Sequence, residues 1–169
     1  MKRLTPHISN NPIAKQVTLL VAFTSCCLLL HQRADAQDYR WGFGLRLSNS
    51  SPTINTSVSG KYFIHEKSAV EGLVSFGSRF GMGALLEIHN TIPGADGLRW
   101  FYGAGPYIGW QDNRTYAGPM GVLGLDYKFP TVPVSLSIDW KPELDISPEI
   151  NFVPDAFALS VRFTLGPKP

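Results

Sequence analysis

The sequence predicts an all-β fold in which eight antiparallel strands close into an up-and-down β-barrel. In eight segments after residue 37, apolar and polar residues alternate with a period of two, which is the spacing of a strand with one apolar face. The 169-residue chain holds 16 Gly, 10 Phe, 6 Tyr and 4 Trp but is only 17% charged, a composition that suits short strands better than a helical bundle. No segment after residue 37 shows the apolar spacing of a long helix.

Residues 1–36 predict a secretory signal peptide that is cleaved before Gln37. An apolar run of fourteen residues, Val17–Leu30, follows Lys15, and Ala34-Asp35-Ala36 supplies an A-x-A cleavage pattern. The alternative is a membrane-spanning helix, but fourteen residues cover only about 21 Å of the roughly 30 Å of hydrocarbon. A lipid anchor on Cys26 is a further alternative, although Phe23-Thr24-Ser25 matches a lipobox poorly. We expect one domain, the barrel, over residues 37–169.

Removal of the leader changes both the charge and the cysteine content. Four of the 15 basic residues and one of the 13 acidic residues precede Gln37, which leaves 11 basic and 12 acidic residues and a net charge of −1. No basic surface for nucleic acid is expected. Because Cys26 and Cys27 both lie in the leader, the mature chain has no disulfide, thiol nucleophile or thiolate metal ligand.

The first four predicted strands place bulky apolar residues on one face and small or polar residues on the other. They are Tyr39–Ser48, Ile54–Ile64, Ala69–Gly77 and Phe80–His89. The first alternates almost without error, whereas Leu73 falls on the polar face of the third. Turn-forming residues separate them: Asn49–Pro52, His65–Ser68 and Ser78-Arg79.

The last four predicted strands follow the same pattern. They are Arg99–Trp110, Pro119–Phe129, Val134–Lys141 and Ala156–Leu165. Pro106 interrupts the first of these because it removes a ladder donor. Longer connections are expected at Gln111–Ala117 and Pro142–Asp155. Strands of about ten residues match the length that a tilted strand needs to cross a bilayer, and an even number returns both termini to the same side.

The composition of the two strand faces predicts a transmembrane barrel. Gly, Ser, Ala and a few charges dominate one face and fit a narrow lumen, whereas the bulky residues of the other face suit lipid. A soluble barrel, the alternative, would reverse the two faces. Aromatic residues also gather near the predicted strand ends, as interfacial belts require. These are Tyr39, Trp41, Tyr62, Trp100, Tyr102, Trp110, Tyr127, Phe129, Trp140 and Phe163.

Several short motifs extend this prediction to a family. They include Ala36–Trp41, Lys61-Tyr62-Phe63, Ile92–Ala95, Trp100–Gly105, Gly124–Phe129, Leu136–Pro142 and Ala158–Thr164. In these motifs the chain resembles small outer-membrane barrel proteins of Bacteroidetes-type bacteria, the OmpA/OmpX-like eight-stranded barrels. The resemblance implies a bacterial outer-membrane location and insertion by the barrel-assembly machinery, but no shared chemistry. The chain departs from the family by ending on Gly166–Pro169 instead of the aromatic residue that this machinery reads, so Phe163 would have to serve.

Charged residues on the lumen face predict an internal network near the periplasmic end. Because an unpaired charge away from water costs several kcal/mol, we expect these residues to pair and close the lumen. They are Arg40, Lys61, Glu71, Glu87, Asp126, Lys128 and Arg162. The alternative, an ion or proton path, needs more room than eight strands leave.

Two residues raise an enzymatic alternative, a lipid-modifying acyl hydrolase or transferase. Glu87 and His89 share a face and could act as a base and its orienting group, with Ser135 or Ser137 as nucleophile. Such an enzyme would expose this group to lipid, whereas both residues are predicted to face inward. A metal at Glu87, His89 and Asp126 is disfavoured because only one His contributes. We therefore expect no catalytic residues, no metal and no cofactor.

The outer rim is the remaining candidate site. The connection Pro142–Asp155 is the longest and carries four acidic residues, Glu143, Asp145, Glu149 and Asp155. It could contact a cation, lipopolysaccharide bridged by divalent ions, or a basic partner, and the alternative is a solvated loop without a partner. The sequence thus predicts a non-enzymatic outer-membrane barrel with a structural or surface-interaction role.

Overall fold

The structure is a computed structural model that describes residues 39–48, 53–77, 79–154 and 157–167. The leader 1–36, its cleavage site before Gln37, the connection 49–52 and the acidic Asp155 lie outside the described residues. Within the described ranges there is no helix long and apolar enough to span a membrane.

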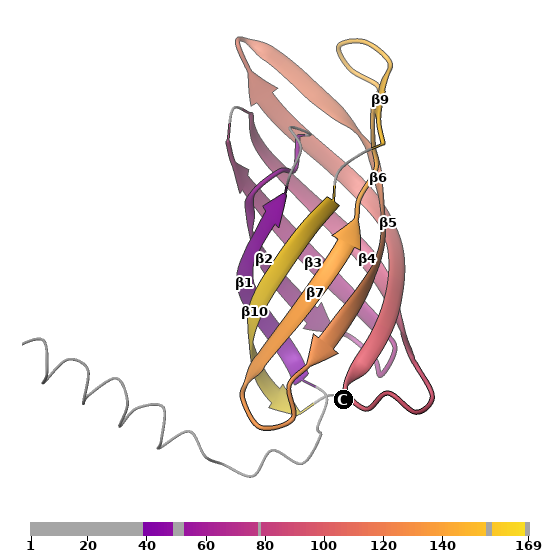
Figure 1. The fold of residues 1–169 in the computed structure, drawn as a ribbon. Coiled ribbons are helices and arrows are strands. Elements are labelled where there is room, and N and C mark those ends of the chain that lie inside the picture. Colours follow the sequence, from indigo (N-terminus) through magenta and orange to yellow (C-terminus); the bar gives the residue numbers. More distant parts are fainter. Residues whose placement is uncertain (1–38, 49–52, 78, 155–156, 168–169) are drawn as a thin grey trace, which may run out of the picture. The chain divides into compact units, whose positions relative to one another are not determined.

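Ten strands make up the described part of the chain. They are β1 (Tyr39–Ser48), β2 (Ser57–Phe63), β3 (Ser68–Phe76), β4 (Phe80–Thr91), β5 (Leu98–Gln111), β6 (Arg114–Lys128), β7 (Val134–Trp140), β8 (Glu143–Asp145), β9 (Asn151–Val153) and β10 (Phe157–Pro167). Neighbours pair antiparallel in the order β5-β4-β3-β2-β1-β10-β7-β6, and a β5–β6 pairing closes the circle (Figure 1). The predicted eight-stranded antiparallel up-and-down barrel is confirmed.

The barrel has two different ends. Tyr39 pairs with Pro167 at one of them, here called the terminal end, where the turns β2–β3, β4–β5 and β6–β7 also lie. The opposite end, the mouth end, carries the β5–β6 and β8–β9 hairpins (Figure 1). Asp112 and Asn113 have φ angles of 48° and 63°, as a two-residue hairpin turn requires. The predicted loop Gln111–Ala117 is therefore wrong, because β6 already begins at Arg114.

The predicted loop Pro142–Asp155 is also largely strand. Met120 of β6 pairs with Glu143 in the same register in which Leu123 pairs with Trp140, so β8 continues the line of β7 past Pro142. β9 then pairs with β8, and the chain returns into β10. The inward-facing residues of this predicted loop therefore belong to the barrel wall.

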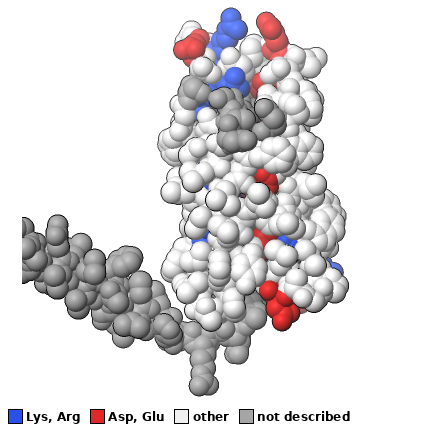
Figure 2. All heavy atoms as spheres, in the orientation of Figure 1, with Lys and Arg blue, Asp and Glu red and all other residues white. Residues whose placement is uncertain are grey.

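The two faces of the wall are opposite in character. On β10, Leu159 and Val161 are exposed to 43% and 47% on the outside, whereas Ser160 and Arg162 between and beside them are almost fully buried. Figure 2 shows the same on a whole face of the barrel, with most Lys, Arg, Asp and Glu near the two ends and a largely uncharged wall between them. Apolar side chains cover the outside, and polar side chains fill much of the inside.

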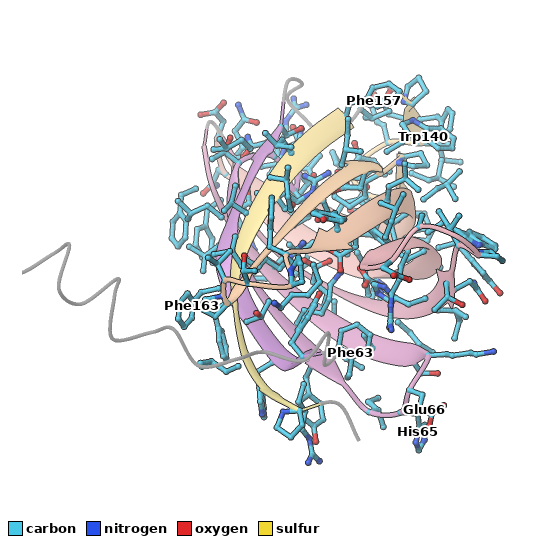
Figure 3. All side chains as sticks on the ribbon, turned by 60° about the horizontal axis from the view of Figure 1, so that its bottom comes forward. Phe63, His65, Glu66, Trp140, Phe157 and Phe163 are labelled. Atoms are coloured by element: carbon cyan, nitrogen blue, oxygen red, sulfur yellow. The ribbon has the colours of Figure 1, made fainter. Side chains whose placement is uncertain are left out.

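Aromatic side chains lie outward near both ends. At the terminal end Trp41 packs on Tyr62 with ring centroids 4.2 Å apart, and toward the mouth end Phe80 stacks on Trp110 at 5.9 Å. Trp140 and Phe157 are a registered pair of β7 and β10 and lie close together in Figure 3. Tyr39 departs from the prediction because it turns inward and packs on buried Phe63.

Candidate functional site: the lumen and its mouth

A first charge layer crosses the lumen in the half nearer the terminal end. Lys61 on β2 places its Nζ 2.7 Å from Glu87 Oε2 on β4 and 3.8 Å from Glu71 Oε2 on β3. Arg162 on β10 forms a salt bridge with Glu71 and donates hydrogen bonds to Ser59 and Ser137. Because four strands contribute one charge each, the layer ties together neighbouring and distant parts of the wall.

Aromatic rings pack against this layer. His89 Nε2 lies 2.9 Å from Glu87 Oε2, and the His89 ring stacks on Phe101 with centroids 4.9 Å apart. Lys61 Nζ lies 4.5 Å from the centroid of the same Phe101 ring, a favourable cation–π contact. Nearer the terminal end, the Tyr39 hydroxyl donates to Asp126 Oδ2 at 2.9 Å. A hollow of about 10 Å³ beside Tyr39 and Asp126 has room for roughly one water.

The structure buries five of the seven charged residues predicted for the network, namely Lys61, Glu71, Glu87, Asp126 and Arg162. Ion pairs join four of them, and Asp126 instead accepts a hydrogen bond from Tyr39. Arg40 was predicted wrongly: it is exposed and donates to the Tyr62 hydroxyl at 2.8 Å. The strict alternation fails at the start of β1, where Tyr39 points inward and Arg40 and Trp41 are both exposed.

Lys128 also lies apart from the network. It is half-buried, and its Nζ donates to the carbonyl oxygens of Phe129 and Val132 in the β6–β7 turn. The parity of β6 is as predicted, but the long lysine side chain reaches the turn at the terminal end instead of an acidic partner.

An apolar layer lies next to the charges on the side of the mouth end. Leu73 is the next inward residue of β3 from Glu71 toward the mouth end, and Leu85 is the next inward residue of β4 from Glu87 in the same direction. Both are buried. They form one cluster with five further side chains, namely Ile54, Phe101, Tyr107, Met120 and Val122. Leu73 thus occupies the polar face as predicted, but it serves there as core.

The residues before β2 fold into the barrel and close it at this level. We call Thr53–Asn55 the mouth segment, and all three of its residues are buried. The sequence predicted a strand from Ile54 with this side chain on the outer face; instead the ladder of β2 begins at Ser57 and Ile54 enters the apolar layer. The Ile54 side chain faces apolar residues while its backbone faces charges.

Charged side chains hold that backbone from the other side of the lumen. Glu143 accepts hydrogen bonds from the backbone N–H groups of Thr53 (2.8 Å) and Ile54 (3.1 Å). Lys141 donates to the Ile54 carbonyl at 3.0 Å, and Arg46 donates to the same carbonyl at 3.3 Å. Arg46 also pairs with Asp139 at 2.6 Å, which completes a second charge layer of Arg46, Asp139, Lys141 and Glu143.

Glycines make room for the mouth segment. A Cβ on Gly109 of β5 would lie 2.3 Å from the Thr53 side chain, and one on Gly81 of β4 would lie 2.8 Å from the Thr53 carbonyl oxygen. A Cβ on Gly77 would lie 2.4 Å from the Asn55 amide. Because these three glycines have no side chain, the lumen has room for the mouth segment.

The four acidic residues predicted as outer contacts separate into three groups. Glu143 and Asp145 were predicted wrongly, because β8 points both of them into the lumen, where they are buried. Asp145 accepts a hydrogen bond from the Tyr107 hydroxyl at 2.7 Å and lies 3.8 Å from Arg79. Glu149 is exposed in the β8–β9 turn, and Asp155 lies outside the described residues.

The prediction missed the second charge layer. Arg46, Asp139 and Lys141 lie on the inward face that the alternation identified, and they differ from the predicted network only in lying nearer the mouth end. The inward position of Glu143 could be found by carrying the parity of Val134–Lys141 past Pro142, since odd-numbered residues stay inward through Asp145.

The chemistry open to these residues is limited by their burial. Glu87 and His89 share the inward face as predicted, and both are buried inside the lumen, away from the outer face of the wall and from solvent. Ser137, a predicted candidate nucleophile, accepts a hydrogen bond from Arg162 at 2.5 Å. Across the described ranges no three His, Cys, Asp or Glu side chains are grouped so that they could hold a metal ion.

The chain matches no protein-family model and no curated protein.

Proposed function

We propose that this protein is a non-enzymatic outer-membrane barrel of the small OmpA/OmpX-like kind, and that it acts in envelope structure or surface contact through its mouth end. One observation carries the proposal: the barrel buries charges and exposes apolar side chains. Arg46, Lys61 and Glu87 are at most 1% exposed, whereas Phe43, Leu45 and Ile138 on the outer wall are 50–56% exposed.

That distribution supports a lipid environment. Soluble proteins seldom expose a contiguous apolar patch of more than a few hundred Å², whereas outward apolar residues occur here on all eight barrel strands. In a bilayer the same residues meet hydrocarbon, and the closed ladder satisfies the backbone groups that lipid cannot. The aromatic contacts near both ends match the interfacial girdles of membrane barrels.

The filled lumen supports a role other than transport. The first charge layer, the apolar layer and the mouth segment occupy the lumen in succession. Eight strands enclose only enough space for side chains, and these side chains pair with one another. A solute would have to break buried ion pairs to pass.

The mouth end supports the surface role. Arg114, Asp112 and Glu149 are exposed there, on the β5–β6 and β8–β9 hairpins. These hairpins extend beyond the ends of β1 and β10 (Figure 1). Their mixed charges offer contacts to lipopolysaccharide headgroups, with or without bridging cations, or to a partner at the cell surface.

The proposal is tested by placing a charge on the wall. The full-length chain is expressed in a Gram-negative host and its outer membranes are separated on a density gradient. We expect the wild-type protein there, and we expect Leu159→Arg to accumulate less and to unfold at lower urea concentration in lipid vesicles. An arginine near the bilayer midplane costs about 2–4 kcal/mol, and near the interface about 0–1 kcal/mol.

Thr115→Arg is the matched control, because Thr115 is exposed near the β5–β6 turn at the mouth end. A protein recovered without detergent, or a Leu159→Arg variant as stable as Thr115→Arg, would refute the membrane location.

The non-enzymatic part of the proposal is tested in vesicles that contain lipopolysaccharide. Release or transfer of an acyl chain that is lost in His89→Ala would establish the enzymatic alternative instead.

A further inference from the structure

The β8–β9 hairpin has the same two faces as the barrel wall. Between Val134 and Ile146 every odd-numbered residue points into the lumen and is buried. This alternation of inward and outward residues continues past Pro142 into β8. On the outer side Leu144 pairs directly with Phe152 of β9, and Ile146 and Phe152 are 60% and 58% exposed. A loop extending into water would have no physical reason to gather its most exposed apolar side chains on the outer side.

The length of the wall agrees with this interpretation. The outward residues of β7 begin at Val134 and end at Trp140, six positions that span about 16 Å along a strand tilted by about 40°. From Leu136 to Ile146 the same line covers ten positions and rises about 26 Å, close to the apolar band of about 25 Å typical of outer-membrane barrels. β7 alone is too short to reach across the hydrocarbon, and its continuation in β8, beside the longer β6, supplies the missing length.

The wall is lower at β1, which is separated from β7 only by β10. The outward apolar row of β1 runs from Trp41 to Leu47, six positions, which corresponds to about 16 Å. The hairpin also joins the wall directly, because the Trp140 indole donates a hydrogen bond to the Pro154 carbonyl just after β9. The apolar surface of the wall is thus continuous from β7 into the hairpin.

We propose that the outer face of the β8–β9 hairpin, formed by Leu144, Ile146 and Phe152, lies in the acyl chains of the membrane leaflet at the mouth end. The inference rests on the proposed membrane location and adds the depth of one element. The hairpin is then a membrane-embedded part of the wall, and the lipid boundary lies near Glu149 in its turn. The occupant is hydrocarbon, supplied by phospholipid or by a lipid A chain.

Single cysteines measure this depth directly. The only cysteines of the chain, Cys26 and Cys27, are changed to serine in the full-length protein. Single cysteines at Phe152, at Leu159 in the mid-wall and at Glu149 are labelled with an environment-sensitive fluorophore. Each labelled protein is folded into phosphatidylcholine vesicles and exposed either to iodide in the water or to nitroxides attached to the acyl chains. Ile146→Cys repeats the measurement on β8, so that one poorly folding variant does not decide the result.

We expect acyl-chain nitroxides to quench Phe152→Cys, Ile146→Cys and Leu159→Cys at least several-fold more than iodide does, and iodide to quench Glu149→Cys. Iodide quenching of both hairpin labels, with Leu159→Cys still in lipid, would overturn the inference and leave the membrane location intact. Iodide quenching of Leu159→Cys as well would refute the membrane location itself. Hairpin labels protected from both quenchers would overturn the inference in favour of a protein contact, such as a second copy of the chain.

Discussion

Lys141 and Glu143 point into the lumen from either side of Pro142, with Lys141 Nζ 2.8 Å from Glu143 Oε1, and together they hold the backbone of Ile54. The pair lies just beyond β7, where the wall strand is interrupted and then resumes as β8. One ion pair therefore fastens the mouth segment to the wall and fixes the inward face of the hairpin.

The first prediction concerns this pair. Glu143→Ala should lower the free energy of unfolding by about 3–5 kcal/mol, because it leaves Lys141 buried without its anionic partner and removes the acceptor for two N–H groups. Urea unfolding in lipid vesicles measures the loss. The control is Glu149→Ala, an exposed position in the adjoining turn, which should change stability by less than about 0.5 kcal/mol. Equal midpoints for the two variants would show that water solvates Lys141.

The second prediction concerns the first charge layer and separates its members from Arg40. Glu71→Ala removes the carboxylate that pairs with Arg162 and lies 3.8 Å from Lys61 Nζ, so we expect a loss of about 3–5 kcal/mol. Arg40→Ala removes only an exposed contact with Tyr62, and exposed polar contacts contribute roughly 0–1 kcal/mol. The same urea titrations compare them, and an Arg40→Ala variant as unstable as Glu71→Ala would contradict the placement of Arg40.

The third prediction concerns closure of the barrel between its first and last strands. A Cβ on Gly44 of β1 would lie 1.9 Å from the Val161 carbonyl oxygen of β10, so Gly44→Ala should force these strands apart. The nearest atom to a Cβ on Gly72 is 3.9 Å away, and Gly72→Ala should fold normally. The yield of folded barrel, followed by the electrophoretic mobility of unheated samples, compares the two. Similar yields would mean that the β1–β10 pairing relaxes at little cost.

The strands were predictable because residues alternate between the outer and the inner face along the whole length of the barrel wall. On β10 the residues from Phe157 to Leu165 alternate between exposed on the outer face and buried on the lumen face, so a period of two identifies both the strand and its faces. The same rule places Lys61, Glu71, Glu87, Asp126 and Arg162 inside. The alternation does not predict which of these residues pair with one another, because pairing depends on the register between strands.

The rule failed where the chain leaves the ladder. Ile54 continues the apolar parity of β2, yet its segment turns inward because Glu143 and Lys141, about 90 positions later in the chain, satisfy its backbone. Glu143 follows a proline and was therefore predicted to lie in a loop. Pairing with β6 instead continues the wall beyond Pro142. In both cases a long-range contact outweighs the local sequence signal, strand parity at Ile54 and a turn at Pro142.

The last prediction is that single barrels in a planar bilayer carry no measurable ionic current. An ion crossing the lumen would meet the Lys61–Glu87 pair, the apolar layer around Leu85 and then the buried mouth segment. Displacing a buried charge from its partner costs several kcal/mol, and an ion gains nothing in the apolar layer to offset this cost. Ile54→Gly, which shortens the mouth segment's side chain, should also be silent because the first charge layer remains. Stepwise currents through the wild-type protein would restore the ion path, and currents in Ile54→Gly alone would assign closure to the mouth segment instead of the charges.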